Sequence, residues 1–189
     1  MNSDYYPWGG EFTACNDKSC VAVVLLNIRY IPPPNVAIYG NLKTENIGIE
    51  KIIANVISNP FIRFLIICGE DIRGHRSGLS LIALHNNGID KNNKIIDAPG
   101  AIPYIENLNK DAIKRFQSQI KIINHVGEID KNIIDESIKK CISQSLPAFG
   151  EPYIAIKIKP KVTTTITDKR ALHSKIVIDY LGKIKKRGK

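Results

Sequence analysis

Two apolar runs, the second interrupted only by Arg63, place the strongest constraint on what this chain can fold into. Cys20–Leu26 and Phe61–Cys68 are rich in Val, Ile and Leu, and each is long enough for one strand. Runs of this kind are typical of strands that are covered on both faces, as in a parallel sheet with helices on each side. The sequence therefore predicts a central pair of fully buried strands.

Segments with helical spacing of apolar residues alternate with strand-like segments. Between the two runs, Thr44 is expected to cap a helix that ends at Asn59-Pro60 and carries the apolar stripe Ile49, Ile52, Ile53, Val56 and Ile57. Further helices are predicted over residues 79–85, 111–120 and 130–143, and further strands over 94–98, 122–126 and 153–159. The alternation predicts an α/β fold, with a Rossmann-like, mostly parallel sheet and helices on both faces.

The charge divides the chain into two parts. Residues 1–156 carry equal numbers of basic and acidic side chains, so the whole formal charge of +9 lies in residues 157–189. We therefore expect an α/β domain over 1–156 and a basic C-terminal extension over 157–189, in which residues 175–180 can add one strand. The extension can bind RNA, an anionic lipid surface or an acidic protein, or it can simply keep the chain soluble.

Compartment signals are few. No uncharged stretch reaches the ~18–20 residues of a membrane-spanning helix, and the first residues lack the pattern of a secretory signal. The four cysteines contain no CxxC pair, which favours reduced thiols. These features predict a cytoplasmic protein without a membrane span.

Three connections are expected at the edge of the sheet where ligands bind, beyond the carboxyl ends of the strands. They are residues 27–44, 69–78 and 98–105, and the second holds three glycines, two acids and His75. Glycine lets a flat ligand approach the backbone, and histidine can serve as acid, base or metal ligand. Three interpretations stay open for this loop: a ligand site, acid–base chemistry by Asp71 and His75, or a plain turn in which His75 caps the next helix.

Other common site motifs are missing from the sequence. No GxGxxG follows the first apolar run, and neither GxxxxGK[ST] nor GxSxG occurs. The remaining histidines have no Cys, His or carboxylate neighbours at zinc-binding spacing. The sequence therefore does not support a dinucleotide site, a P-loop, the nucleophile elbow of a hydrolase or a zinc site.

Five short motifs follow one another along the chain: Lys43–Lys51, Asn59–Phe64, Arg73–Gly78, Ala83–Gly88 and Gly100–Leu108. In this order they resemble the A subunit of tetrahydromethanopterin S-methyltransferase from methanogenic archaea, and the resemblance covers roughly residues 18–155. Members of that family are corrinoid carriers in a membrane complex. The complex moves a methyl group from methyl-tetrahydromethanopterin to coenzyme M.

The resemblance implies a cobamide cofactor, either cobalamin or 5-hydroxybenzimidazolylcobamide, with His75 as the lower axial ligand of its cobalt. Gly69, Gly74, Ser77 and Gly78 then belong to the loop under the corrin. The position of the strand ends adds further candidate cofactor-binding residues: Thr44, Glu45, Asn46, Pro99, Gly100, Ala101 and Ile102. The implied partners are the other methyltransferase subunits, with methyl-tetrahydromethanopterin and coenzyme M as indirect donor and acceptor and no nucleic acid. Because cobalt carries the methyl group, no catalytic side chain is expected.

Two features of the sequence differ from what the family and other cobalamin proteins show. Lys157–Lys189 stands in place of the hydrophobic anchor of the family, so we expect a soluble homologue that serves this or a different methyltransferase system. Arg73 stands where other cobalamin proteins, with the motif Asp-x-His-x-x-Gly, have an aspartate that supports the histidine. Another group must therefore orient the second ring nitrogen of His75.

Overall fold

Five strands form one sheet in the computed structural model, which describes residues 5–156, 176–178 and 184–186. The strand order is β1-β3-β2-β4-β5. The strands are β1 (Phe12–Ala14), β2 (Val21–Leu25), β3 (Ile38–Asn41), β4 (Phe64–Gly69) and β5 (Lys121–Val126). Neighbours from β3 to β5 are parallel, whereas β1 is antiparallel to β3. The prediction of a mostly parallel α/β sheet is confirmed.

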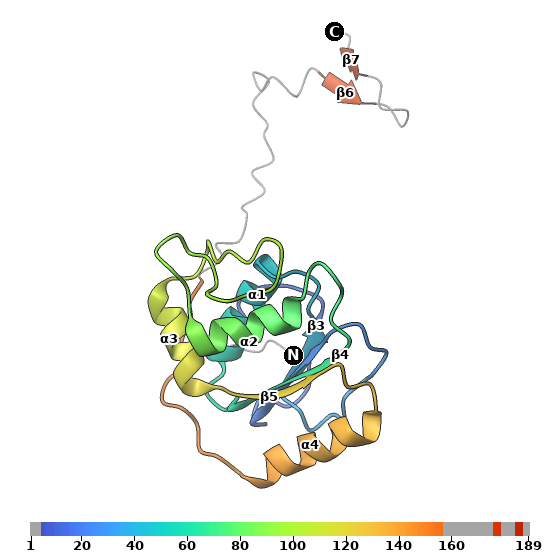
Figure 1. The fold of residues 1–189 in the computed structure, drawn as a ribbon, viewed down its shortest axis with the longest axis vertical. Coiled ribbons are helices and arrows are strands. Elements are labelled where there is room, and N and C mark those ends of the chain that lie inside the picture. The colour runs from blue at the N-terminus through green and yellow to red at the C-terminus, as the bar shows by residue number, and fades with distance from the viewer. Residues whose placement is uncertain (1–4, 157–175, 179–183, 187–189) are drawn as a thin grey trace. The chain divides into compact units, whose positions relative to one another are not determined.

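Helices cover both faces of this sheet. α1 (Ile47–Ser58), α2 (Ser77–Asn87) and α3 (Lys110–Gln119) lie on one face and α4 (Lys131–Ser143) on the other (Figure 1). Alternate side chains of β2 and β4 enter two separate cores: Ala22, Val24, Leu65 and Ile67 on the side of α1, and Val21, Val23, Phe64 and Ile66 on the side of α4. Both strands are buried on each face, which explains their continuous apolar sequences.

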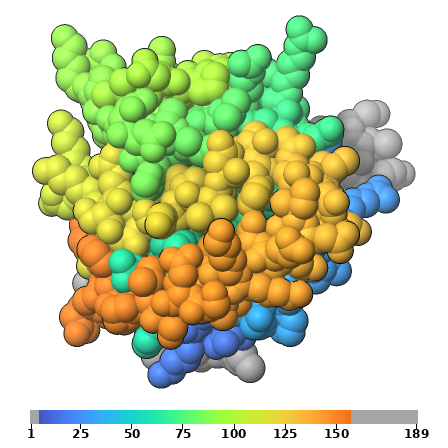
Figure 2. All heavy atoms as spheres, turned by 60° about the horizontal axis from the view of Figure 1, so that its bottom comes forward, coloured from blue at the N-terminus to red at the C-terminus, as the bar shows by residue number. Residues whose placement is uncertain are grey.

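The α4 side of the sheet is covered by a helix together with a loop. Tyr30 and Val36, from the connection between β2 and β3, share a core with Ile134 and Ile138 of α4. Figure 2, with the bottom of Figure 1 brought forward, shows α4 and the chain that follows it spread over this face. The proline-containing connection therefore takes the place of a second helix here.

The chain divides into two units, Met1–Ile158 and Lys159–Lys189. In the second unit β6 (Ile176–Ile178) pairs antiparallel with β7 (Ile184–Lys186). The strand predicted over 175–180 therefore includes β6, which belongs to a two-stranded sheet and not to the main one. The rest of the predicted extension lies outside the described residues. Within the described ranges, no helix has both the length and the apolar character needed to cross a membrane.

Several predicted strand positions are wrong. β3 lies within the connection expected over residues 27–44, and no strand was predicted at the position of β1. Residues 94–98 add no strand to the sheet but make isolated bridges, Ile89 with Ile95 and Lys94 with Tyr104. Residues 153–156 form no strand, and the N–H of Tyr153 donates to the carbonyl of Ile57 at 3.2 Å. Residues 157–159 of that prediction lie outside the described part. Residues 94–98 therefore pair with segments close to them in the sequence and not with the main sheet.

The start of α1 also differs from the prediction. Asn46 is the N-cap, and its side-chain oxygen accepts from the N–H of Ile47 at 2.7 Å. The hydroxyl of Thr44, the predicted cap, accepts from the N–H of Gly48 at 3.0 Å. Two side chains therefore share the exposed N–H groups of the first turn, and both come from the segment that follows β3.

Candidate functional site

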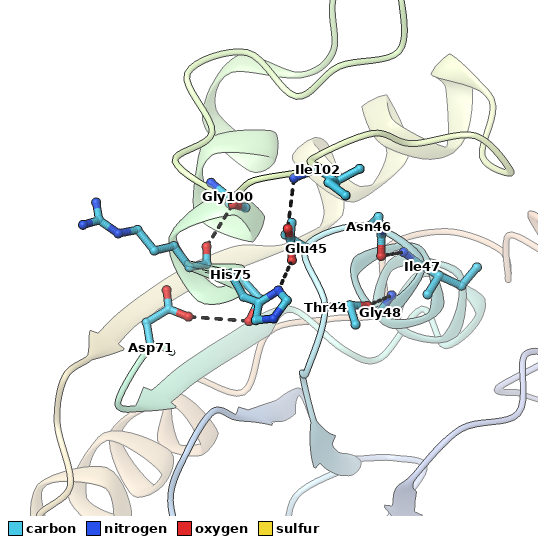
Figure 3. A network of polar contacts seen from close by, with 12 residues as sticks. Thr44, Glu45, Asn46, Ile47, Gly48, Asp71, His75, Gly100 and Ile102 are labelled. Carbon is cyan, nitrogen blue, oxygen red and sulfur yellow. Dashed lines mark hydrogen bonds and ion pairs between the residues drawn. The ribbon is translucent and has the colours of Figure 1, made fainter. Parts of the chain in front are cut away.

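The candidate site lies where the strand order reverses. β3 lies on one side of β2 and β4 on the other, so the loops after these strands diverge at the carboxyl edge of the sheet. Three segments meet there: residues 42–46 after β3, residues 70–76 after β4, and residues 98–105 between α2 and α3. Figure 3 shows Glu45, His75 and Gly100 from these three segments close together.

His75 and Glu45 form the central contact of this edge. Nδ1 of His75 lies 3.0 Å from Oε2 of Glu45, and Oε1 of Glu45 accepts from the N–H of Ile102 at 3.0 Å (Figure 3). The Glu45 side chain is 4% exposed, whereas that of His75 is 54% exposed. Within the described residues, Nε2 of His75 makes no hydrogen bond. A buried carboxylate therefore holds one ring nitrogen while the other is left available.

The environment of Glu45 favours its charged form. Burial by itself raises the pKa of this carboxyl, but hydrogen bonds from its own backbone N–H, from the N–H of Ile102 and from His75 outweigh burial. The resulting pKa is below the ordinary value for glutamate. Glu45 is therefore an ionised acceptor at neutral pH, because charged carboxylates are favoured by such donors.

Asp71 connects the His75 loop to α2. One carboxylate oxygen accepts from the N–H of Gly78 at 3.1 Å and the other from the N–H of Leu79 at 2.9 Å, while the Ser77 hydroxyl lies 3.5 Å away. Asp71 thus caps the N-terminus of α2, which begins two residues earlier than predicted. The structure pairs His75 with Glu45 and gives Asp71 a different set of partners.

Gly100 lets the third segment close over this contact. A Cβ at this position would lie 2.7 Å from Cγ of Glu45, 2.7 Å from the carbonyl oxygen of His75 and 2.8 Å from the hydroxyl of Ser80. The N–H of Gly100 donates to that same hydroxyl at 3.2 Å. Only glycine fits here without displacing the neighbouring loops.

The other predicted residues have varied positions around the same edge. Gly69 closes the end of β4 with a positive φ, and a Cβ there would lie 2.8 Å from Ile28. Gly74 also has a positive φ, and the space beside it is open. Pro99, Ala101 and Ile102 are exposed on the third segment. Thr44 and Asn46 cap α1, and Ser77 and Gly78 contact Asp71, so these four have structural partners within their own loops.

Exposed apolar side chains border this edge. Ile47, Ile102 and Tyr104 line a hollow of about 160 Å³ together with Asn46, and all three are at least one-third exposed. Ile72, in the loop with His75, is 49% exposed. Such side chains beside a half-exposed histidine suit a large, partly apolar ligand. Ile47, Ile72 and Tyr104 were not predicted from the sequence, because their exposure cannot be read from residue type.

A separate cavity of about 240 Å³ lies between α1 and the strands β1, β3 and β2. Its walls include Ala22, Ile38 and Ile52, and of the predicted site residues it reaches Thr44. It does not border His75 or Glu45. The cavity is therefore a neighbour of the candidate site and not its centre.

The other described histidines have structural partners. Nε2 of His85 lies 2.8 Å from the carbonyl of Ile120, and its ring packs edge-on against Phe116. Nε2 of His125 lies 2.7 Å from the hydroxyl of Ser137. In the part of the chain that the structure describes, no three His, Cys, Asp or Glu side chains gather to hold a metal ion. His75 is therefore the histidine best placed for a ligand that brings its own metal.

Comparison with known proteins gives one family. The family model that describes the A subunit of tetrahydromethanopterin S-methyltransferase matches residues 2–165. The chain is 41% identical over 155 residues to the A subunit of the putative methyltransferase Mtx of Methanosarcina barkeri, and the match covers 82% of this chain and 79% of that protein.

Two further relatives are longer than the region they share with this chain. Identity is 46% over 154 residues with the A 1 subunit of tetrahydromethanopterin S-methyltransferase of Methanothermobacter thermautotrophicus, covering 79% of this chain and 65% of the relative. Identity is 43% over 150 residues with the A subunit of tetrahydromethanopterin S-methyltransferase of Methanosarcina barkeri, and this match covers 77% of this chain and 62% of the relative. On these matches, the chain belongs to the family of the tetrahydromethanopterin S-methyltransferase A subunit.

Proposed function

We propose that this chain is a methyl-carrier protein that binds a cobamide, cobalamin or 5-hydroxybenzimidazolylcobamide, at the edge formed by Glu45 and His75. Nε2 of His75 is the proposed lower axial ligand of the cobalt. The observation that carries this proposal is the half-exposed imidazole of His75, engaged through Nδ1 alone, in the glycine-containing loop after a central strand. A neutral ring nitrogen in such a position is a suitable ligand for a transition metal.

The residues around His75 fit a large, flat ring. Ile72 in the loop with His75 and Ile102 in the third segment offer exposed apolar surface, and Gly74 leaves open space beside the backbone. Gly100 allows the third segment to lie against Glu45 and His75 without a side chain between them. These features support the assignment of Gly74, Gly100 and Ile102 to the cofactor site.

The bound cobamide would supply the cobalt that accepts and releases the methyl group. The side chains of this protein then have binding and positioning tasks. His75 offers a neutral nitrogen, Glu45 holds the ring of His75, and Asp71 ties the loop to α2. The chain has no need of a catalytic acid, base or nucleophile in this role.

Partner subunits are proposed to bring the methyl donor and acceptor to the exposed edge. We propose methyl-tetrahydromethanopterin as the donor and coenzyme M as the acceptor, each acting through a partner. The names of two relatives support the proposed donor, because both are subunits of tetrahydromethanopterin S-methyltransferase. An α/β unit with a ligand site at an exposed edge is suited to deliver a group between two partners.

A second candidate is a corrinoid carrier for a different methyltransferase. The similarity to the A subunit of the putative methyltransferase Mtx, at 41% identity, supports this alternative. The two candidates share the cobamide site and differ in the partner that receives the methyl group. An acid–base enzyme that uses Asp71 with His75 is less well supported, because Asp71 binds the N–H groups of α2 and His75 binds Glu45.

Binding of hydroxocobalamin to the purified chain tests the proposal. We expect the pink chain–cobalamin complex to survive gel filtration, with a visible spectrum that differs from free hydroxocobalamin. His75→Ala should keep the fold and most of the affinity but shift the spectrum toward that of water-ligated, base-off cobalamin. His85→Ala, in which a structural histidine is removed, is the matched control and should keep the wild-type spectrum. Failure of the folded wild-type chain to retain cobalamin would refute the proposed function.

A further inference from the structure

We infer that Glu45 is a positioning residue that holds the imidazole of His75 with its proton on Nδ1, so that the lone pair of Nε2 faces outward. The importance of this arrangement for cobalt rests on the proposed function. The arrangement itself does not, because it follows from contacts within the chain. It also supplies the missing orienting group: the loop of His75 has Arg73 where an aspartate would support the histidine in other cobalamin proteins.

The hydrogen-bonding capacities of the two side chains determine the tautomer. A carboxylate only accepts hydrogen bonds, and a neutral imidazole has one donor and one acceptor nitrogen. Oε2 of Glu45 lies 3.0 Å from Nδ1 of His75, so Nδ1 must be the donor. Nε2 is then the acceptor, which is the form that binds a metal.

The structure holds Glu45 in place from several sides. Its second oxygen accepts the N–H of Ile102, and Gly100 packs against Cγ. The next residue, Asn46, is the N-cap of α1, which fixes the backbone on that side. Because the side chain is buried while His75 is half-exposed, Glu45 orients the ring and is itself shielded from solvent. The same carboxylate therefore links the loops after β3 and β4 to the segment before α3.

Glu45→Gln is a sharp test because it reverses the donor pattern at constant size. The N–H of Ile102 needs an acceptor, so the amide oxygen of the glutamine stays on Ile102 and its NH2 group faces Nδ1. Nδ1 must then accept, and the proton of the ring moves to Nε2. Long-range 1H–15N correlation of the histidine rings in the purified full-length chain without cobalamin reports the tautomer, with the signals of His75 assigned from their loss in His75→Gln.

Glu50→Gln is the matched control. Glu50 is also buried, and its carboxylate accepts from the backbone and side-chain amides of Asn107 at 2.7 and 2.6 Å, without contact to His75. This variant removes a buried carboxylate of the same kind, so it reproduces a general loss of stability. A merely structural role for Glu45 would give the same histidine spectrum in both variants.

We expect His75 to be the Nδ1–H tautomer in the wild type and in Glu50→Gln. In Glu45→Gln the ratio of Nδ1–H to Nε2–H should fall by about tenfold or more, as for loss of a charge-assisted hydrogen bond. An unchanged ratio in folded Glu45→Gln would overturn the inference. So would a predominantly Nε2–H ring in the wild type, a result that needs no variant to fold. Because cobalamin is absent, failure of this test leaves the test of cobalamin binding intact.

Discussion

Cys68 lies in the fully buried strand β4, and its surroundings suppress thiol chemistry. Burial raises the pKa of Cys68 to about 12 and also raises the pKa of Cys20 and Cys141, both of which are less than one-tenth exposed. Cys15 is partly exposed, although burial raises its pKa too. Because the thiolate is the reactive form, we expect one thiol, Cys15, to react with DTNB in the native protein at neutral pH.

The four thiols should all react once the protein is unfolded in guanidinium. Cys15→Ser should abolish the native reaction and leave the other three thiols for the unfolded state. Fast reaction of Cys68 in the native Cys15→Ser variant would contradict the buried position of β4.

Glu45 gives the chain a pH-dependent stability whose sign follows from its pKa. The pKa of Glu45 in the folded state is lower than in the unfolded state, so the unfolded chain takes up the proton first as the pH falls. The ionised Glu45 carboxylate therefore contributes its full share of the free energy of unfolding at neutral pH. This share is lost as the pH falls through the pKa of Glu45 in the folded state. Urea unfolding of wild type and Glu45→Gln at a series of pH values should show a stability difference that narrows with acidification. A difference that widens would contradict the ionised carboxylate.

At the scale of elements, the N-terminus of α2 depends on a side chain six residues before it. Asp71→Ala removes the acceptor for Gly78 and Leu79 and should lower the free energy of unfolding by about 1 kcal/mol, as for loss of an N-cap. Asp71→Asn keeps an acceptor oxygen and should cost less. Urea denaturation measures both effects.

The same pair of variants separates a capping role from an acid–base role. Asp71→Asn should retain cobalamin, because the loop keeps its connection to α2. A stable Asp71→Asn protein that cannot bind cobalamin would show that Asp71 does more than cap the helix.

The elements that could be predicted from the sequence are those whose pattern is local. β2 and β4 have continuous apolar runs, and α1 and α4 have apolar stripes bounded by capping residues. β3 could not be predicted, because Ile38-Tyr-Gly-Asn is short, contains glycine and becomes a strand through pairing with β2. Residues 94–98 read as a strand, but Asp90 accepts the N–H of Lys94 at 2.9 Å and Ile95 pairs with the segment of Pro103. Such pairings depend on the fold and not on propensity.

In the candidate site, too, features with a local sequence pattern could be predicted and contacts between distant segments could not. The position of His75 at the carboxyl edge could be predicted from the strand before it and the glycines around it. Its pairing with Glu45 could not, because the two residues are thirty positions apart and meet only when β3 and β4 flank β2. The hydrogen bond from Ile102 to Glu45 could likewise not be predicted, because Ile102 donates through its backbone N–H and not through its side chain.

At the scale of the whole molecule, the basic C-terminal part should be dispensable for cofactor binding. Every described residue of the candidate site lies within Met1–Ile158, and the family match ends at residue 165. Deleting Asp168–Lys189 should therefore leave the Kd for cobalamin within about threefold of wild type. Association with acidic partners or surfaces should weaken and lose its salt dependence. A folded truncated chain that cannot bind cobalamin would place part of the site in the deleted segment.

The coordination of cobalt by His75 is the central claim, and electron paramagnetic resonance of the bound Co(II) form of cobalamin tests it most directly. An axial 14N nucleus splits each cobalt line into three, and a 15N nucleus splits it into two. The chain labelled with 15N-histidine and loaded with unlabelled cobalamin should therefore show doublets, which His75→Ala should lose and His85→Ala should keep. Triplets that persist in the 15N-labelled protein would show that the cofactor's own base remains on cobalt, and they would contradict the account.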